Sequence, residues 1–213
     1  MSTFSRIMEN PHDFRISLTK EELDLLRRFK AKHILEVFCG DARNLVALSK
    51  LGYQVVGVEE NKELLEKASD RINVIEHPVF EEPLPFAGQR FDAVYSWQYI
   101  NHNFKNKIER VFEEIYRVLK RGGLFSIKVS DFEQLNFKKI GDNIYEEQDL
   151  EFGKMKYKMI ASQTFIKLSG KEKDIPHYAF YKKELEQVLE KIGFIVINAR
   201  KIKWNIVANF KKE

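Results

Sequence analysis

The chain has 213 residues, of which 44% are hydrophobic and 32% are charged, and its formal net charge is +4 at pH 7. This length suits one domain with a hydrophobic core, and so mild a net charge does not indicate nucleic-acid binding. The single cysteine, Cys39, excludes an intrachain disulfide and is typical of a reducing cytoplasm. No apolar run approaches the ~20 residues that span a membrane, and residues 1–13 lack the apolar core of a signal peptide.

The first predicted element is a helix that begins after Thr19. Thr19 and Glu22 have the spacing of a capping box, in which each side chain accepts a hydrogen bond from the backbone N–H of the other residue. Apolar residues follow at helical spacing, namely Leu23, Leu25, Leu26 and Phe29. We expect this helix to pack against a sheet edge or to cover a ligand cleft.

Residues 34–59 have the pattern of a strand, a tight turn, a helix and a second strand. The apolar run at 34–38 suits a buried parallel strand, and the small residues that follow it turn the chain. A helix at 44–50 stops at Gly52, and a second buried strand ends on Glu59 and Glu60. In such a unit the turn offers backbone N–H groups to a ligand, and the acidic strand end accepts hydrogen bonds from a ribose.

Helices and strands continue to alternate along the chain. We expect a helix from Asn61 to about residue 70, strands at 72–75 and 91–96, a helix at 106–120 that Gly122 and Gly123 end, and a strand at 124–129.

The pattern changes after residue 130. Period-two alternation at 155–159 and 164–168 predicts antiparallel strands, so 130–174 forms a β-rich insertion near the mouth of the site. A helix at 181–192, which Gly193 stops, precedes a terminal pair of strands at 194–199 and 202–210. The whole chain is therefore expected to be one α/β domain with a doubly wound, mostly parallel sheet.

Four passages of the chain resemble class I S-adenosylmethionine-dependent methyltransferases. The family's first motif is an acidic residue before a Gly-x-Gly-x-Gly turn, and it matches Glu36, Phe38, Gly40 and Ala42. The acidic end of the family's second strand matches Glu59, and residues 91–95 and 117–124 are similar to its fourth-strand and helix–turn–fifth-strand passages. The resemblance implies a seven-stranded Rossmann-like sheet, transferase activity and S-adenosylmethionine as cofactor.

The match departs from the family pattern at two glycines and at one acidic position. Phe38 and Ala42 stand where the family has its first and third glycines, which let a ligand approach the backbone. A phenylalanine there either narrows the cofactor pocket or points away from it. After the third strand, Phe80 stands where the family often has an acidic residue, so the adenine contact differs.

The resemblance also implies which residues hold the cofactor. Glu59 accepts hydrogen bonds from the ribose hydroxyls, and Glu36 reaches the amino group of the methionine moiety, while Asp41 and Asn44 either touch that end or cap the helix. The cofactor-binding residues expected in this way are Glu36, Phe38, Gly40, Asp41, Ala42, Asn44, Glu59, Glu60, Val79, Phe80, Ser96 and Trp97.

Three residues are candidates for catalysis, namely Tyr99, His102 and His177. Methyl transfer from a sulfonium depends mainly on alignment, and a base helps only if the acceptor carries a proton. His102 stands where the family often has histidine, and 175–178 is similar to a Pro-His-Tyr passage of some small-molecule methyltransferases. No His, Cys or Asp cluster has metal-ligand spacing in the sequence.

A small-molecule acceptor is the leading hypothesis for the substrate. The insertion offers apolar side chains to an acceptor pocket, namely Met155, Tyr157, Met159 and Phe165. The stretch 96–99 is not the Asn/Asp-Pro-Pro-Tyr motif of nucleic-acid amino methyltransferases. A basic face, if one exists, comes from Lys154, Lys156, Lys158, Lys201, Lys203, Lys211 and Lys212.

Two other functions stay open at this point. One is a methyltransferase that acts on protein or nucleic acid, and the other is a non-catalytic binding module with the same fold. An NAD-dependent oxidoreductase fits poorly, because the usual glycine pattern is broken. The sequence does not define the oligomeric state.

Overall fold

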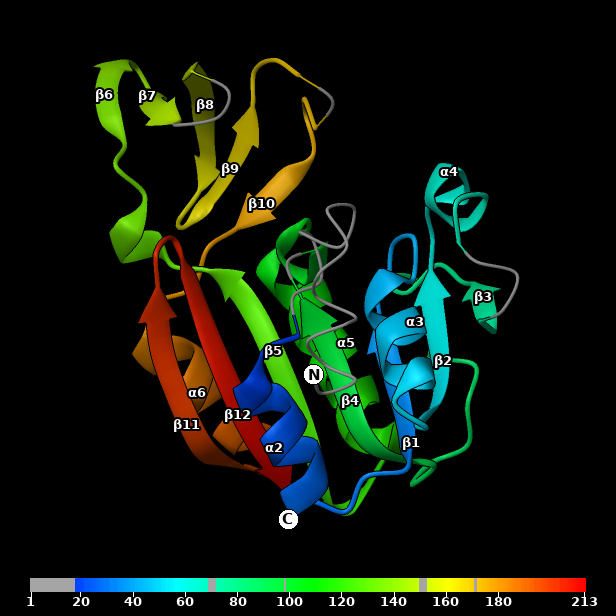
Figure 1. Cartoon of the computed structure of the whole chain (residues 1–213). Helices are drawn as coiled ribbons and strands as arrows, with labels where there is room; N and C mark the ends of the chain where they lie inside the picture. Colours follow the sequence, from blue (N-terminus) through cyan, green and yellow to red (C-terminus); the bar gives the residue numbers. More distant parts are fainter. Residues whose placement is uncertain (1–17, 69–71, 98, 150–152, 171) are drawn as a thin grey trace.

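A seven-stranded sheet forms the centre of the computed structural model, which describes residues 18–68, 72–97, 99–149, 153–170 and 172–213. The strand order is β11-β12-β5-β4-β1-β2-β3 (Figure 1). The strands are β1 (His33–Val37), β2 (Gln54–Glu59), β3 (Val74–Glu76), β4 (Phe91–Trp97), β5 (Leu119–Ser130), β11 (Phe194–Ile202) and β12 (Asn205–Lys212). Parallel pairing joins β3 through β5, and β12 runs antiparallel to both neighbours. The sheet is therefore doubly wound and mostly parallel, as the sequence predicts.

Helices cover both faces of this sheet. They are α2 (Lys20–Arg28), α3 (Arg43–Lys50), α4 (Lys62–Leu65), α5 (Lys105–Val118) and α6 (Lys182–Ile192). Phe112 of α5 and Leu185 of α6 are buried with Phe125 of β5 in one core cluster. Leu26 of α2 joins Tyr95 of β4 in a second cluster on the opposite face. Because side chains alternate along each strand, the sheet buries apolar residues on both faces.

The start of α2 agrees with its sequence signal, but its position differs from the expectation. Thr19 is the N-cap, and the capping box with Glu22 is complete. The helix lies on the face of the central strands, where Leu26 packs in one cluster with Ala93 and Leu124. The expected place at a sheet edge or over the cleft was wrong, because the apolar stripe of α2 is buried against the middle of the sheet.

The ends of two helices differ from the sequence prediction, and so do the bounds of β3, β5, β11 and β12, which were expected at 72–75, 124–129, 194–199 and 202–210. α4 ends at Leu65, and residues 69–71, which the predicted helix included in part, lie outside the described residues. α5 ends at Val118, and Gly122 and Gly123 lie inside β5 instead of ending the helix. The pairing register between β4 and β5 shifts at this point, and Gly122 has a φ of 73°. The two glycines therefore accommodate an irregular start of β5.

A second, five-stranded antiparallel sheet stands over the larger one (Figure 1). Its strands are β6 (Lys138–Gly141), β7 (Ile144–Asp149), β8 (Gly153–Ala161), β9 (Thr164–Lys167) and β10 (Pro176–Tyr178), in the order β10-β9-β8-β7-β6. The sequence predicted β8 and β9 but not the other three strands. Backbone hydrogen bonds tie this sheet to the end of β5, since Phe132 N donates to Phe180 O at 2.9 Å and Phe180 N donates to Ser130 O at 3.0 Å.

Among the described residues, no helix combines the length and apolar character that a membrane crossing needs. The prediction that residues 1–13 lack a signal peptide concerns residues outside the described part of the chain.

Candidate cofactor and acceptor site

The turn between β1 and α3 has a left-handed backbone at three alternate residues. Phe38, Gly40 and Ala42 have φ values of 62°, 59° and 58°. Glycine adopts this conformation freely, whereas for other residues it costs roughly 1–2 kcal/mol of conformational free energy. The turn thus keeps the backbone of a glycine-rich loop, although two of the three positions carry side chains.

Glu59, at the end of β2, organises the same turn through its carboxylate. Its Oε2 accepts a hydrogen bond from Gly40 N at 2.8 Å, and its Oε1 accepts from the N–H groups of Glu60 and Asn61 at 3.0 and 2.9 Å. Gly40 itself is open to one side, because a Cβ built on it meets nothing within 4 Å. A carboxylate has about four acceptor positions, so one on Oε2 remains available to a ligand.

Glu36 of β1 is buried beside the turn with one oxygen unpaired. Its Oε1 accepts from Asn44 Nδ2 at 2.7 Å, and its Oε2 has no hydrogen-bond partner among the described residues. Burial raises the pKa of Glu36 to about 8, and the Asn44 hydrogen bond opposes that shift. An unpaired buried carboxyl oxygen is a natural partner for a cationic group.

A row of aromatic rings leads from the turn to the second sheet. The ring centroid of Tyr99 lies 5.3 Å from that of Phe38 and 4.5 Å from that of His102. His102 lies 4.3 Å from His177, which stacks on Phe165 at 5.5 Å. The three residues that the sequence singles out for catalysis are therefore neighbours in space, and Tyr99 among them contacts Phe38 of the turn.

A cavity of about 310 Å³ opens between the two sheets, at the end of the ring row. It is lined by Asn101, His102, Ser130, Leu135, Glu147, Tyr157, Phe165, Lys167, Glu172, His177, Trp204 and Asn205. Of the apolar residues that the sequence offers for a pocket, Tyr157 and Phe165 line it. Met155 and Met159 instead pack against the small core of the second sheet. The volume lies within the range of small-molecule sites.

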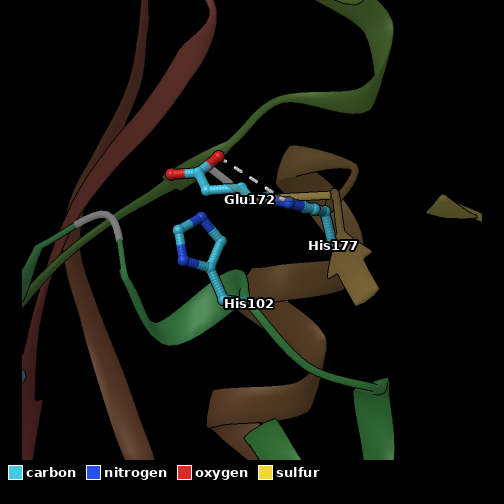
Figure 2. A group of neighbouring side chains, drawn as sticks. All are labelled: His102, Glu172 and His177. Carbon is cyan, nitrogen blue, oxygen red and sulfur yellow. Dashed lines mark ion pairs between the residues drawn. The ribbon is translucent and has the colours of Figure 1, made fainter. Parts of the chain in front are cut away.

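The polar end of the cavity is formed by His102, Glu172 and His177 (Figure 2). Burial lowers the pKa of His102 to about 4 and that of His177 to about 3, so both rings are neutral near pH 7. Glu172 is ion-paired with Lys167 and lies 3.8 Å from His177 Nε2. Sequence reasoning missed Glu172, because it is one of 32 acidic residues and only the fold brings it near the histidines.

Comparison with known proteins supports the same type of fold. Residues 34–123 match the family model of a methyltransferase domain. The chain is 26% identical over 179 residues to a sterol 24-C-methyltransferase of Pneumocystis carinii, a match that covers 79% of this chain and 41% of that protein. The chain thus spans about two fifths of the length of this relative.

Two solved structures share the fold over most of both chains. An S-adenosylmethionine-dependent methyltransferase from Clostridium acetobutylicum gives a TM-score of 0.65 at 14% identity, with 98% of this chain and 97% of that chain covered. The 1,6-didemethyltoxoflavin-N1-methyltransferase of Burkholderia thailandensis, with 1,6-didemethyltoxoflavin and S-adenosylhomocysteine bound, gives 0.61 at 16% identity, with 98% and 86% covered. Residues 34–123 therefore match a methyltransferase domain, and the chain shares the fold of S-adenosylmethionine-dependent methyltransferases.

S-adenosylmethionine is the cofactor of this methyltransferase family, and three features of the turn fit it. The unpaired Oε2 of Glu36 suits the cationic amino group of the methionine moiety. The free acceptor position on Glu59 suits a ribose hydroxyl, and the open side of Gly40 lets a ligand approach the backbone. The assignment of each residue to its part of the cofactor stays a prediction.

The other expected cofactor residues of the methyltransferase lie in different surroundings. Asp41 is ion-paired with Arg43, whose Nε donates to Oδ1 at 2.7 Å, so this carboxylate serves the turn itself. Glu60 is half-buried, and burial together with the Glu59 charge raises its pKa to about 7. Asp41 is therefore part of the turn, whereas Glu60 lies beside Glu59 after the end of β2.

The remaining candidates are buried on the two faces of the sheet. Val79 and Phe80 belong to the main core cluster, and the Phe80 ring lies 4.8 Å from that of Phe38. Ser96 is fully buried, and its Oγ has no partner among the described residues. Trp97 lies in the cluster under α2 and donates from Nε1 to Ser126 Oγ at 3.3 Å. The fold thus does not bring Trp97 together with Phe80.

Proposed function

We propose that this protein transfers the methyl group of S-adenosylmethionine to a small molecule bound in the cavity between the two sheets. The main support for this proposal is the position of the cavity, which is lined by His102. The ring of His102 contacts that of Tyr99, and the ring of Tyr99 contacts that of Phe38 in the turn between β1 and α3. The names of the similar sterol and toxoflavin methyltransferases support a small acceptor. On this proposal the chain is one methyltransferase domain, with 130–174 as its acceptor-side insertion.

The residues of the chain act mainly by positioning. The cofactor supplies a methyl group on a positively charged sulfur, and alignment with the acceptor's nucleophile provides most of the rate. Glu36 and Glu59 hold the cofactor on one side, and the cavity holds the acceptor on the other. His102 and His177 are weak bases at neutral pH, so we assign them contact with the acceptor instead of proton removal. Tyr99 stays protonated, because burial raises its pKa.

The surroundings of several lysines argue against a nucleic-acid substrate. Lys154 pairs with Glu146 at 3.2 Å, and Lys201 pairs with Asp131 at 3.2 Å. Lys212 is buried, and its Nζ donates to Tyr116 O at 2.6 Å. Three lysines of the suspected basic face are thus engaged within the protein.

Cys39 is a buried free thiol, in keeping with the cytoplasmic location that the sequence predicts.

The first test is calorimetric titration of the purified chain with S-adenosylmethionine and S-adenosylhomocysteine. We expect both to bind, and Glu59→Ala to weaken binding by ~1–3 kcal/mol because a charged acceptor is lost. Screening of small molecules for methyl acceptance follows. A folded protein that binds neither compound would support the non-catalytic binding module instead.

A further inference from the structure

Three potential metal ligands converge at the polar end of the cavity (Figure 2). His102 follows β4, Glu172 lies between β9 and β10, and His177 is part of β10. One ligand atom of each residue lies within 4.8 Å of those of the other two. His177 Nε2 is 3.8 Å from Glu172 Oε2. The fold therefore gathers two imidazoles and one carboxylate from separate segments.

One nitrogen of each imidazole in this cluster has no hydrogen-bond partner among the described residues. His177 is only 4% exposed, and its Nε2 makes no hydrogen bond with the described residues. His102 Nδ1 is also buried and without a hydrogen-bond partner among the described residues, whereas Nε2 is the nitrogen of this ring that points toward Glu172 (Figure 2). Leaving a buried polar atom unpaired destabilises a protein, so such atoms usually meet water, an ion or a ligand. Both residues line the cavity, from which an ion can reach them.

We propose that His102, Glu172 and His177 bind a divalent transition-metal ion whose remaining coordination positions face the cavity. Two imidazoles and one carboxylate suit zinc or iron(II), and three protein ligands leave a position open for another molecule. Tetrahedral zinc, with ligands at ~2.0–2.2 Å, separates neighbouring ligand atoms by about 3.3 Å. The present 3.8 Å between His177 and Glu172 is near that value, so small side-chain rotations complete the site.

Lys167 now supplies positive charge at the same place. Its Nζ pairs with Oε2 of Glu172, the oxygen that also faces His177 Nε2. The Lys167 side chain is 27% exposed, so its long stem can turn toward solvent when a metal ion takes the carboxylate. The metal ion and the lysine therefore compete, and removal of the lysine charge should strengthen metal binding.

A metal ion in this position would hold an oxygen or nitrogen donor of the acceptor. The open coordination position faces the cavity, and the ring of His102 leads through Tyr99 toward the cofactor turn. Coordination lowers the pKa of a bound donor's proton, which makes the donor a better nucleophile near neutral pH. The acceptor class implied is a molecule with a hydroxyl or amine that can bind a metal.

The test is calorimetric titration of Zn²⁺ into the full chain, without a histidine tag and after treatment with a chelator. We expect one ion to bind per chain. Glu172→Gln and His177→Gln should each weaken binding by at least about tenfold, the loss seen even for residues that only support a metal ligand. Lys167→Met should bind more tightly than the wild type.

The matched control is His33→Gln, because His33 pairs with Asp92 far from the cluster and should leave Zn²⁺ binding unchanged. Thermal unfolding checks that each variant is folded, and the spectrum of bound Co²⁺ reports which variants change its ligands. No Zn²⁺ binding by the wild type, or binding as tight as the wild type's in both ligand variants, would overturn the proposal. The titration contains no S-adenosylmethionine, so such a result leaves the proposed methyl transfer standing.

Discussion

At Phe38 the backbone conformation is unfavourable, whereas burial of the side chain is favourable. Its φ of 62° costs a side chain roughly 1–2 kcal/mol. Its ring is 5% exposed and packs between Phe80 and Tyr99, and burying a phenylalanine contributes ~1.5–3 kcal/mol. Packing outweighs the strain, which explains why the position can lack glycine. Of the two orientations that the sequence left open, the ring takes the one in the core.

Phe38→Gly should therefore destabilise the protein. Loss of a buried ring costs ~3–5 kcal/mol, and relief of the left-handed strain returns ~1–2 kcal/mol. We expect the free energy of unfolding to fall by about 2–3 kcal/mol in urea titrations. Ala42→Gly is the matched control, since it mainly relieves strain and should be neutral or stabilising by up to ~1 kcal/mol. A Phe38→Gly protein as stable as the wild type would place the ring outside the core.

Glu36 should release a proton when the cofactor binds. With a pKa of about 8, its carboxyl is mostly protonated at pH 7, and a cation beside it lowers the pKa. The enthalpy of S-adenosylmethionine binding should therefore differ between two buffers of different ionisation enthalpy. Glu36→Gln should remove that difference. Equal enthalpies for the wild type in both buffers would show that Glu36 does not meet the cationic end.

The same carboxyl should make stability depend on pH. Because the folded pKa of about 8 exceeds the unfolded value of 4.5, the folded state binds more protons between these values, and stability falls as the pH rises through this window. Glu36→Gln carries no titrating group, so its stability relative to the wild type should grow from pH 5 to pH 8. A difference that stays constant with pH would contradict the shifted pKa.

Elements with strong local signals could be predicted from the sequence. The capping box of α2, the glycine stop of α6 and the apolar runs of β1 and β4 each depend on neighbouring residues. In contrast, the residues of β6 are all exposed, so no apolar pattern marks that strand. The antiparallel pairing of β6 with β7 supplies what its local sequence does not.

The residues of the candidate site also differ in whether local sequence could predict them. Glu36, Gly40 and Glu59 follow from a motif within one βαβ unit, so their proximity could be predicted. Glu172 meets His102 only because the second sheet folds over the carboxyl ends of the strands. Such contacts arise from tertiary structure, and a single sequence does not contain them in local form.

Thr19→Ala should weaken the start of α2. The substitution removes the side chain that accepts a hydrogen bond from Glu22 N, and it breaks the reciprocal capping box. Loss of such a cap costs ~1 kcal/mol, which urea unfolding can measure. Thr19→Ser keeps the hydroxyl and should retain most of the stability. Equal losses in the two variants would indicate that the methyl group, and not the cap, matters.

At the scale of the whole molecule, Glu184 of α6 links the two sheets. It accepts hydrogen bonds from Lys105 Nζ at 2.7 Å, from Tyr178 Oη at 2.5 Å and from Gln163 Nε2 at 2.6 Å. Lys105 belongs to α5, whereas Tyr178 and Gln163 belong to the second sheet and its turn. One partly buried carboxylate thus fixes the sheet that covers the cavity.

Glu184→Ala should loosen the second sheet selectively. Hydrogen exchange of the backbone amides in β8, β9 and β10 is expected to accelerate, while the amides of β1 and β4 keep their protection. Glu186→Ala is the control, because Glu186 pairs with Lys182 inside the same helix, at 3.0 Å. If exchange rises equally in both sheets, Glu184 supports the whole fold and not the connection.

The chain segment that forms the second sheet begins and ends at adjoining points of the larger sheet, where Asp131 and Phe180 form a bridge. Everything that the insertion contributes to the cavity is therefore encoded by one uninterrupted stretch of gene whose two ends meet in space. On the function proposed above, recombination can exchange this stretch as a cassette and leave the cofactor half untouched. A change of acceptor then needs the exchange of one gene segment and no redesign of the catalyst, which offers an evolutionary route to new products.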